Sequence, residues 1–212
     1  MSPSQRPLVI SIGLDASGQI PEHRRMNAAI STLADDLIVL EPFVAADGPA
    51  LVAGEDEEQA RRFGWWPARS TPASVAAAIA AWQADEQLGR SRRARAIHLV
   101  KDHALVGGCE VRLVGDAVAE LSYWVFPAYR GQAIAARAVH LLAPWAAAEF
   151  GIKTFRLEIE PDNVPSRRVA AADGFVAAGQ RVGDTGAVML LFERTEPPLL
   201  PGHRSDLPKI AG

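Results

Sequence analysis

Hydrophobic positions recur along the chain with two periods, and each period predicts a different kind of element. Residues 154–160 alternate between polar and apolar side chains, which is typical of a strand with one buried face. Three further apolar runs, separated by turn residues, cover residues 96–101, 105–113 and 117–126. Because they are short, rich in valine and leucine and closely spaced, they predict an antiparallel meander of three strands.

Helical spacing marks longer segments. Residues 131–150 carry an apolar stripe with a period of about 3.6 residues, and Pro144 within it is expected to kink the helix or end its regular part. The sequence Ser70-Thr-Pro supplies a hydroxyl cap and a first-turn proline for a second helix, which extends through Gln87. Shorter helical segments are predicted at 47–53, 55–63 and 164–173.

The remaining segments complete an alternating order of strands and helices. Short strands are predicted at 37–40, 175–182 and 187–193, and Arg90–Arg95 is interpreted as a solvated basic connector. The fold class is therefore α/β, with a mixed, largely antiparallel sheet flanked by helices.

The two ends of the chain are set apart from this folded region. Residues 1–36 are assigned to an N-terminal extension, with a strand candidate at 8–12 and a weak helical pattern at 26–37. One domain covers 37–194, and the prolines of residues 195–212 predict an extended tail.

Composition excludes several classes of protein. With 22 Lys and Arg against 25 Asp and Glu, the chain of 212 residues has a net charge of −3, so broad electrostatic binding to nucleic acid is not expected. The single cysteine, Cys109, excludes an intrachain disulfide framework. No apolar run approaches the roughly 20 residues of a membrane span, and no signal peptide is evident, so a cytoplasmic protein without a membrane partner is expected.

The most informative motif joins the third meander strand to the long helix. A short loop ends in Arg130-Gly131 at the predicted start of the helix, with small residues also at 133 and 135. Unpaired N–H groups and the positive end of the helix dipole can hold a pyrophosphate there, and Arg130 adds a cation. An ordinary strand-to-helix turn with a solvated arginine explains these residues about equally well.

A second motif follows the next strand. Asn163 can cap the short helix that it precedes, and Ser166 lies in the first turn of that helix. Capping alone accounts for Asn163 and only partly for Ser166. The spacing and the context favour contacts of both residues with a bound thiol-linked ligand.

Taken together, these motifs carry a resemblance to a known family. The stretch from Leu37 to Arg194 resembles the GNAT N-acetyltransferase superfamily, and most closely the branch that acetylates the N-termini of ribosomal proteins. The matching segments, in chain order, are Leu37–Pro42, Trp65-Trp66-Pro67, Val106-Gly107-Gly108, Glu120–Val125, Arg130–Ala135, Asn163–Ser166 and Gly174-Phe175. Their order and spacing are specific to the family, although no single segment is decisive.

The resemblance implies an N-acetyltransferase that uses acetyl-CoA as cosubstrate and a primary amine as acceptor, either a protein N-terminus or a small amine. It also implies that two parallel strands, ending near Phe126 and Glu160, splay so that the pantetheine arm lies between them. A backbone N–H there would polarise the thioester carbonyl. The residues implied to bind the cosubstrate are Trp124, Val125, Phe126, Arg130, Gly131, Gln132, Ala133, Ile134, Ala135 and Asn163.

The chain departs from the family pattern at two positions. Ala133 stands where the phosphate loop of the family has glycine, so a Cβ faces the ligand. Many members carry a tyrosine in the helix after the asparagine as general acid for the leaving thiolate, and the corresponding residue here is Ala170. The resemblance therefore assigns the proton donor to Ser166, with water or Tyr123 as the remaining sources.

The acceptor amine must be neutral to attack, so a base is needed. Glu120 is the first candidate because it shares a strand face with Ser122 and Trp124. Glu110, Glu158 and Glu160 are further candidates, and a solvated or ion-paired carboxylate is the simpler interpretation of each.

Other functions are weighed against this one. His98, His103 and His140 have no ligand-like spacing, so no metal site is expected. A GNAT-fold module that binds acyl-CoA or a partner without catalysis is the alternative function, and a closed gap between the two strands would favour it. A homodimer is left open.

Overall fold

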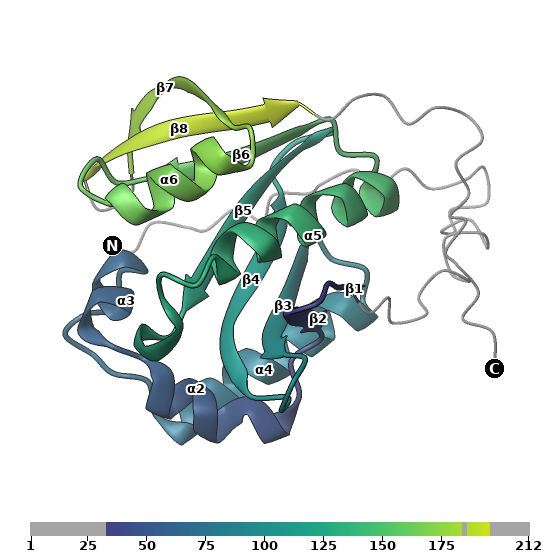
Figure 1. Cartoon of the computed structure of the whole chain (residues 1–212), viewed down its shortest axis with the longest axis vertical. Helices are drawn as coiled ribbons and strands as arrows, with labels where there is room; N and C mark the ends of the chain where they lie inside the picture. Colours follow the sequence, from purple (N-terminus) through teal and green to yellow (C-terminus); the bar gives the residue numbers. More distant parts are fainter. Residues whose placement is uncertain (1–32, 184–185, 196–212) are drawn as a thin grey trace, which may run out of the picture. The chain divides into compact units, whose positions relative to one another are not determined.

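The computed structural model describes residues 33–183 and 186–195, which form an eight-stranded sheet with helices on both faces (Figure 1). In chain order the elements are β1 (Leu33–Ala34), β2 (Ile38–Glu41), η1 (Ala45–Asp47), α2 (Gly48–Gly54), α3 (Glu57–Arg62), α4 (Pro72–Gln87), β3 (Arg92–Leu99), β4 (Leu105–Leu113), β5 (Val118–Val125), η2 (Pro127–Tyr129), α5 (Ile134–Phe150), β6 (Thr154–Ile159), α6 (Val164–Ala172), β7 (Val176–Val182) and β8 (Val188–Thr195). The strand candidate at 8–12 and the tail after Thr195 lie outside the described residues. None of the helices in 33–183 has the length and apolar character needed to cross a membrane.

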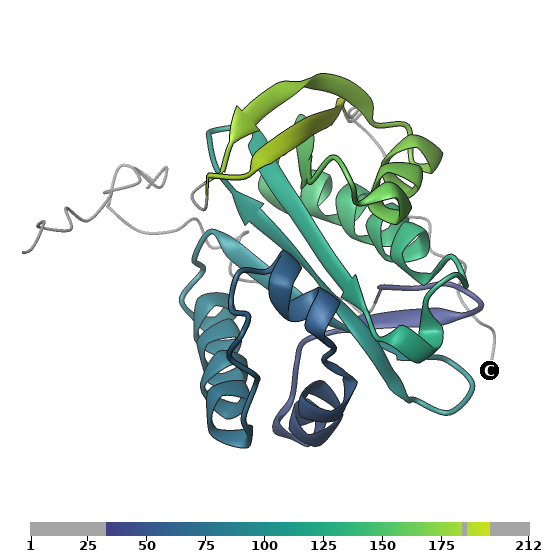
Figure 2. The same ribbon diagram turned by 90° about the vertical axis from the view of Figure 1, so that its left-hand side faces the viewer.

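The sheet has the strand order β1-β2-β3-β4-β5-β6-β8-β7. Every neighbouring pair is antiparallel except β5 and β6, which run parallel at the centre. Helices α5 and α6 lie on one face, and α2 and α4 lie on the other (Figure 2). The mixed, largely antiparallel sheet expected from the sequence is therefore confirmed.

Two hydrophobic clusters hold these layers together. On the α5 side, residues such as Leu142 pack against Phe155 and Leu157 of β6, the apolar face predicted from alternation. On the other side, the ring of Trp124 lies parallel to that of Phe43, with centroids 6.0 Å apart. Burying side chains of this size stabilises the fold by about 1.5–3 kcal/mol each.

Close approach of β4 to β5 explains the paired glycines of the meander. A Cβ on Gly107 would lie 2.2 Å from the carbonyl oxygen of Trp124, and one on Gly108 would lie 2.3 Å from its ring. Both separations are shorter than van der Waals contact, so only glycine fits at these two positions. Next to them Cys109 is fully buried, and burial raises the pKa of its thiol to about 12.

The interpretation of Arg90–Arg95 as a solvated connector is wrong, because residues 92–95 are part of β3. Arg95 is only 1% exposed, its guanidinium is bonded to Glu86 at 2.7 and 2.8 Å, and it lies over the ring of Trp145. Arg92 pairs in the same way with Asp85. Carboxylates from the last turn of α4 thus pair with the arginines of this strand and allow it to be buried. The composition of residues 90–95 alone does not reveal these partners.

The weak helical pattern at 26–37 is also wrong where it can be checked. Leu33 and Ala34 form β1 and pair with Leu40 and Val39 of β2, so the sheet begins before residue 37. Residues 26–32 lie outside the described part of the chain.

Two predicted helix starts have different outcomes. The capped start of α4 is confirmed, because Thr71 accepts a hydrogen bond from the Ser74 N–H at 3.1 Å. The long helix α5 begins at Ile134 instead of residue 131, since Gly131 and Ala133 have positive φ values of 77° and 60°. It continues through Pro144 to Phe150, so the proline does not end it.

Ala133 occupies a left-handed conformation that disfavours residues with a Cβ. We therefore expect Ala133→Gly to raise the free energy of unfolding by about 1 kcal/mol, because removal of the strain exceeds the entropy that glycine adds to the unfolded chain. Urea denaturation measures this change. The matched control is Ala148→Gly at an exposed position of α5, which should lower stability by about 0.5–1 kcal/mol. Destabilisation by both substitutions would contradict the strain at Ala133.

Candidate active site

The two parallel strands at the centre of the sheet separate along their length. They are paired at Val118↔Thr154, Ala119↔Phe155 and Glu120↔Arg156, and the pairing stops there although β5 continues to Val125 and β6 to Ile159. A cleft of about 670 Å³ lies where they have separated, lined by residues of α3, β5, α5, β6 and α6. This is the splay that the family resemblance implied.

Along the cleft, the edge of β5 that faces away from β4 has no partner strand. The Phe126 N–H bonds the Val106 carbonyl at 2.8 Å, so alternate residues from Phe126 back toward Glu120 present their N–H groups to β4. The intervening residues, Tyr123 and Val125, present theirs to the cleft. Backbone contacts with the ligand were expected from Trp124, Val125 and Phe126. Only the Val125 N–H faces the cleft. Trp124 is a lining residue whose N–H points to β4, and Phe126 is not a lining residue.

A cradle of N–H groups lies at one end of the cleft. The first three residues of α5, Ile134 to Ala136, have no acceptor for their N–H groups within the helix. Within the described chain, no carbonyl accepts from the N–H of Gly131, Gln132 or Ala133 either. Except for Gln132, all of these residues line the cleft, so the predicted loop can hold an anion through its backbone.

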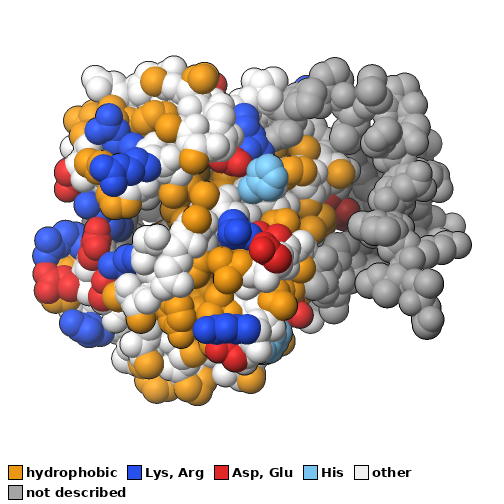
Figure 3. All heavy atoms as spheres, in the orientation of Figure 1, with side chains coloured by type: hydrophobic (Ala, Val, Ile, Leu, Met, Phe, Trp, Pro, Cys, Tyr) orange, Lys and Arg blue, Asp and Glu red, His pale blue; other side chains and the backbone are white. Residues whose placement is uncertain are grey.

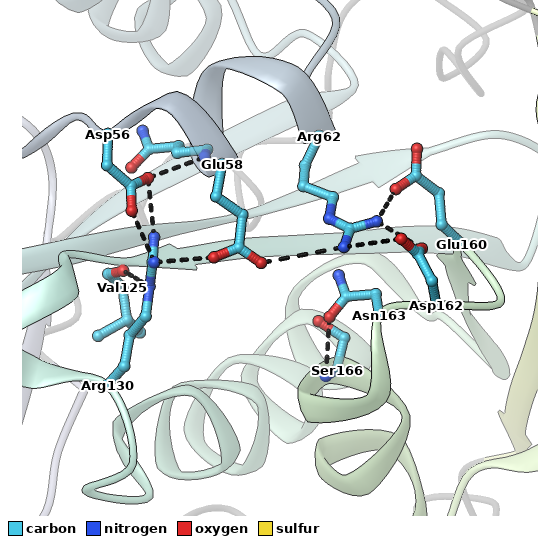
Figure 4. A network of polar contacts seen from close by, with 10 residues as sticks. Asp56, Glu58, Arg62, Val125, Arg130, Glu160, Asp162, Asn163 and Ser166 are labelled. Carbon is cyan, nitrogen blue, oxygen red and sulfur yellow. Dashed lines mark hydrogen bonds and ion pairs between the residues drawn. The ribbon is translucent and has the colours of Figure 1, made fainter.

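Arg130 is not a solvated cation. Its guanidinium contacts Asp56 at 2.7 and 3.0 Å and Glu58 at 3.1 Å, and its Nε donates to the Val125 carbonyl at 3.0 Å (Figure 4). Burial alone would raise the pKa of Asp56, but hydrogen bonds from Arg130 and from the Gln59 N–H bring it below its usual value. The positive charge expected to face a phosphate is therefore already paired with α3.

A second arginine continues this network on the opposite side of the cleft. Arg62 of α3 bonds Glu160 and also contacts Asp162 at 2.7 Å, and these bonds raise its pKa. Glu58 lies 3.9 Å from Arg62 and so links the two arginines. Figure 3 shows the resulting gathering of acidic and basic side chains over α3. Helix α3 thus connects the ends of the two separated strands.

Asn163 and Ser166 meet as the sequence predicted. The Asn163 Oδ1 accepts the Ser166 N–H at 3.2 Å at the start of α6, and both residues line the cleft. No described residue is bonded to the Ser166 hydroxyl, so it is available to a ligand. The Tyr123 hydroxyl donates to the Ser166 carbonyl at 3.4 Å, and burial raises the pKa of this phenol to about 12. Two residues with hydroxyl groups, Tyr123 and Ser166, therefore contact each other on the cleft wall.

Glu120, the first candidate for the base, is not brought to this cleft. It pairs with Arg112 of β4 at 2.6 Å and is not among the lining residues. Glu110 is also outside the lining, and burial raises the pKa of its carboxyl. The carboxylates that do line the cleft are Glu58, Glu158 and Glu160, and Glu158 is held by Arg181.

A second hollow of about 660 Å³ adjoins the cleft between α3 and the turn after β6. It shares Glu58, Arg62 and Glu160 with the cleft, so the two open into the same region. Its charged lining residues are Glu57, Glu58, Glu160, Asp162, Arg61 and Arg62. Carboxylates outnumber guanidinium groups, which favours a cationic occupant.

Arg168 is a lining residue that the sequence interpretation missed. It is exposed on α6, and within the described chain it has no hydrogen-bond or ion-pair partner, unlike Arg130 and Arg62. The sequence holds no signal for it, because residues two positions apart on a helix, such as Ser166 and Arg168, do not share a face. An unpaired guanidinium in the lining can add a charge-assisted contact to an anionic ligand.

Comparison with known proteins identifies the family. Residues 38–176 match the acetyltransferase (GNAT) domain. A comparison with curated protein sequences gave no significant match.

Solved structures share the fold. A putative ribosomal-protein-serine acetyltransferase from Vibrio cholerae has 17% identity and a TM-score of 0.66 over 78% of this chain and 98% of its own. Mycobacterium smegmatis RimJ, in complex with CoA-disulfide, has 21% identity and a TM-score of 0.67 over 79% and 88%. The microcin C7 self-immunity acetyltransferase MccE, in complex with acetyl-CoA and AMP, has 16% identity and a TM-score of 0.65 over 76% and 94%. With its splayed parallel strands and with the domain match covering most of its length, the chain belongs to the GNAT acetyltransferase family.

Proposed function

We propose that this protein transfers an acetyl group from acetyl-CoA to a primary amine by direct attack on the thioester. The observation that carries the proposal is the open cleft between β5 and β6, whose unpaired backbone edge leads to a cradle of free N–H groups. An extended arm with amide groups and an anionic end matches both features. The coenzyme A and acetyl-CoA complexes of the fold neighbours RimJ and MccE support the same ligand.

The residues present fit this cosubstrate. The N–H groups of Gly131 and Ala133 and of the first turn of α5 would hold the pyrophosphate, and Arg168 is an unpaired cation in the lining of the same cleft. The Val125 N–H faces the interior of the cleft, where it can donate to a thioester carbonyl as negative charge develops on the oxygen. Asn163 holds α6, and with it Ser166, against the same ligand.

The two arginines of the cleft are expected to respond differently to truncation. Arg168→Ala should weaken coenzyme A binding by about 1.5–3 kcal/mol without destabilising the fold, because it removes a charge-assisted contact that only the ligand uses. Arg130→Ala should lower the free energy of unfolding by about 1–2 kcal/mol, because it removes contacts to α3 and to Val125. Calorimetry and urea denaturation of both variants measure the two effects. Equal losses of affinity with unchanged stability would contradict this division of roles.

Ser166 is proposed as the proton donor to the departing thiolate. Ser166→Ala should lower turnover roughly 10²-fold while acetyl-CoA affinity stays nearly unchanged, since the contact strengthens only in the transition state. Alanine is a good helix former, so the fold should be retained. Wild-type turnover in this variant would remove Ser166 from the mechanism. A loss in Tyr123→Phe instead would assign the donor to the neighbouring phenol.

The acceptor amine is proposed to enter through the second hollow, and Glu160 is proposed as the base or the anchor of a basic water. Both carboxylates are paired with an arginine, Glu160 with Arg62 and Glu120 with Arg112, but only Glu160 borders the cleft and the hollow. We expect Glu160→Gln to lower kcat/KM by about 10²-fold and Glu120→Gln to leave it nearly unchanged. Measuring kcat/KM for both variants distinguishes the two assignments, and the reverse order would restore Glu120.

The acceptor class is proposed to be a protein or peptide N-terminus. The neighbours named as ribosomal-protein acetyltransferases support this class, and the excess of carboxylates in the second hollow suits a cationic amine. The direct experiment is a screen of peptide N-termini and small amines with acetyl-CoA, in which released thiol is followed. Thiol release with a peptide amine supports the proposal, and release with small amines alone would replace the acceptor class.

A closed gap between the strands would have favoured the alternative function, a non-catalytic acyl-CoA-binding or interaction module. The cleft of about 670 Å³ removes that support and leaves room for a cosubstrate. Measurable coenzyme A binding without thiol release for any amine would restore the alternative.

A further inference from the structure

Three potential metal ligands meet at the edge of the sheet where β2 and β3 lie side by side (Figure 1). Glu41 is the last residue of β2, His98 lies in β3, and His103 lies in the turn between β3 and β4. Their ligand atoms all lie within 4.8 Å of one another. The histidines are five positions apart, which on a continuous strand would place them on opposite faces, and so their spacing does not indicate a shared site.

The turn between β3 and β4 brings the two histidines together despite this spacing. The β3–β4 ladder shifts register between Ile97 and His98, and His103 adopts a left-handed conformation with φ of 58°, uncommon for a residue other than glycine. The ring of His103 consequently folds back over that of His98, with centroids 4.4 Å apart.

The distances match a small tetrahedral ion. The Glu41 Oε2 lies 3.4 Å from His98 Nδ1 and 3.3 Å from His103 Nε2. Ligand atoms that bind zinc tetrahedrally at about 2.0–2.1 Å are separated by about 3.4 Å. Two of the three separations are therefore already those that such an ion requires, and the separation between the two histidine nitrogens is within 4.8 Å. The ring of His103, stacked on that of His98 at an interplanar angle of 10°, would rotate to direct its lone pair at the ion, and its side chain is exposed.

His98 is oriented as a metal-binding histidine is. It is only 4% exposed, and its Nε2 lies 3.0 Å from Oδ1 of Asp47, a carboxylate that is buried as well. The other Asp47 oxygen accepts the Val44 N–H at 2.9 Å, which holds the carboxylate in place. The Nε2 can donate to Asp47, and no described residue hydrogen bonds with the buried Nδ1, whose neighbouring carboxylate is Glu41. A carboxylate on the far nitrogen is the usual support of a metal-bound imidazole.

We propose that Glu41, His98 and His103 bind a divalent transition-metal ion, best matched by Zn²⁺, with water in the fourth position. Two imidazoles and one carboxylate are a ligand set that suits zinc, and a divalent cation there would also lie close to the carboxylates of Glu41 and Asp47. The ion would join β2 to the β3–β4 turn and, through Asp47, to the start of α2. The site uses no residue of the cleft or of the second hollow.

The test uses the full chain, first stripped with a chelator and then titrated with Zn²⁺ alone. We expect one ion per chain by elemental analysis, a rise in melting temperature on binding, and a visible absorption spectrum typical of tetrahedral coordination when Co²⁺ replaces Zn²⁺. His103→Ala, at an exposed position, should abolish the Co²⁺ spectrum and weaken zinc binding by about 100-fold. Asp47→Asn should weaken it roughly 10- to 100-fold with the spectrum retained.

The control is His140→Ala, because His140 is exposed and contacts Asp173 elsewhere on the molecule. It should leave stoichiometry and affinity unchanged. Full zinc binding in His103→Ala, or loss of binding only when His23 or His203 is replaced, would overturn the proposal. So would the absence of binding at micromolar Zn²⁺ in a folded chain, since a proton on His98 Nδ1 would then be what balances Glu41 and Asp47.

Discussion

The structure depends on one interruption in the hydrogen bonding of its sheet. β5 and β6 share only three residue pairs, yet each strand stays paired on its outer edge, β5 with β4 and β6 with β8. The sheet is consequently two well-paired halves joined at a short parallel seam. Beyond the seam, the inward-facing N–H and C=O groups of β5 have no partner strand, and buried backbone groups of this kind need an acceptor or donor from elsewhere. Arg130 supplies a donor for the Val125 carbonyl, and the proposed cosubstrate, an extended molecule with amide groups, would supply further partners. The interruption is therefore the origin of the cleft.

Helix α3 spans the interruption with ionic contacts in place of backbone hydrogen bonds. Arg130 ties α3 to the β5 side through Asp56, and Arg62 ties it to the β6 side through Glu160 and Asp162. Partly exposed ion pairs contribute only about 0–1 kcal/mol each, far less than continued strand pairing would. The two halves are therefore held at a fixed separation without being closed on one another, and individual pairs can exchange for contacts with a ligand at little cost in stability.

The sequence predicted those parts of the molecule that depend on neighbours in the chain. Alternation identified β6, the cap and proline identified α4, and the Asn163–Ser166 box identified the start of α6, because each signal is generated within a few residues. The family resemblance added the parallel splay. What failed was decided by partners that lie on another helix or strand. Arg95 became a buried strand residue through Glu86, and Glu120 was drawn to Arg112 on the neighbouring strand.

Arg130 and the histidines follow the same rule. The motif placed Arg130 correctly at the cradle, but its charge is neutralised by α3, some seventy positions earlier in the chain. His98 and His103 come together only because a turn with a left-handed residue reverses the chain between them. The place of a residue within a motif was thus predictable from the sequence. The ion pairs and contacts of its side chain were not, because they depend on which residues lie next to it in the folded structure.

The distribution of charge around the splay gives the site its direction. At one end are the N–H groups of the α5 N-terminus, which favour an anion, and Arg168 of α6 is an unpaired cation in the lining of the same cleft. At the other end, past Glu160, carboxylates outnumber guanidinium groups and attract a cation. Arg130 and Arg62 contribute little net field, because carboxylates pair with both of them and Glu58 lies between the two. Under the proposed function, an anionic donor and a cationic acceptor would be drawn to different parts of one opening and would meet where Val125, Ser166 and Glu160 border it.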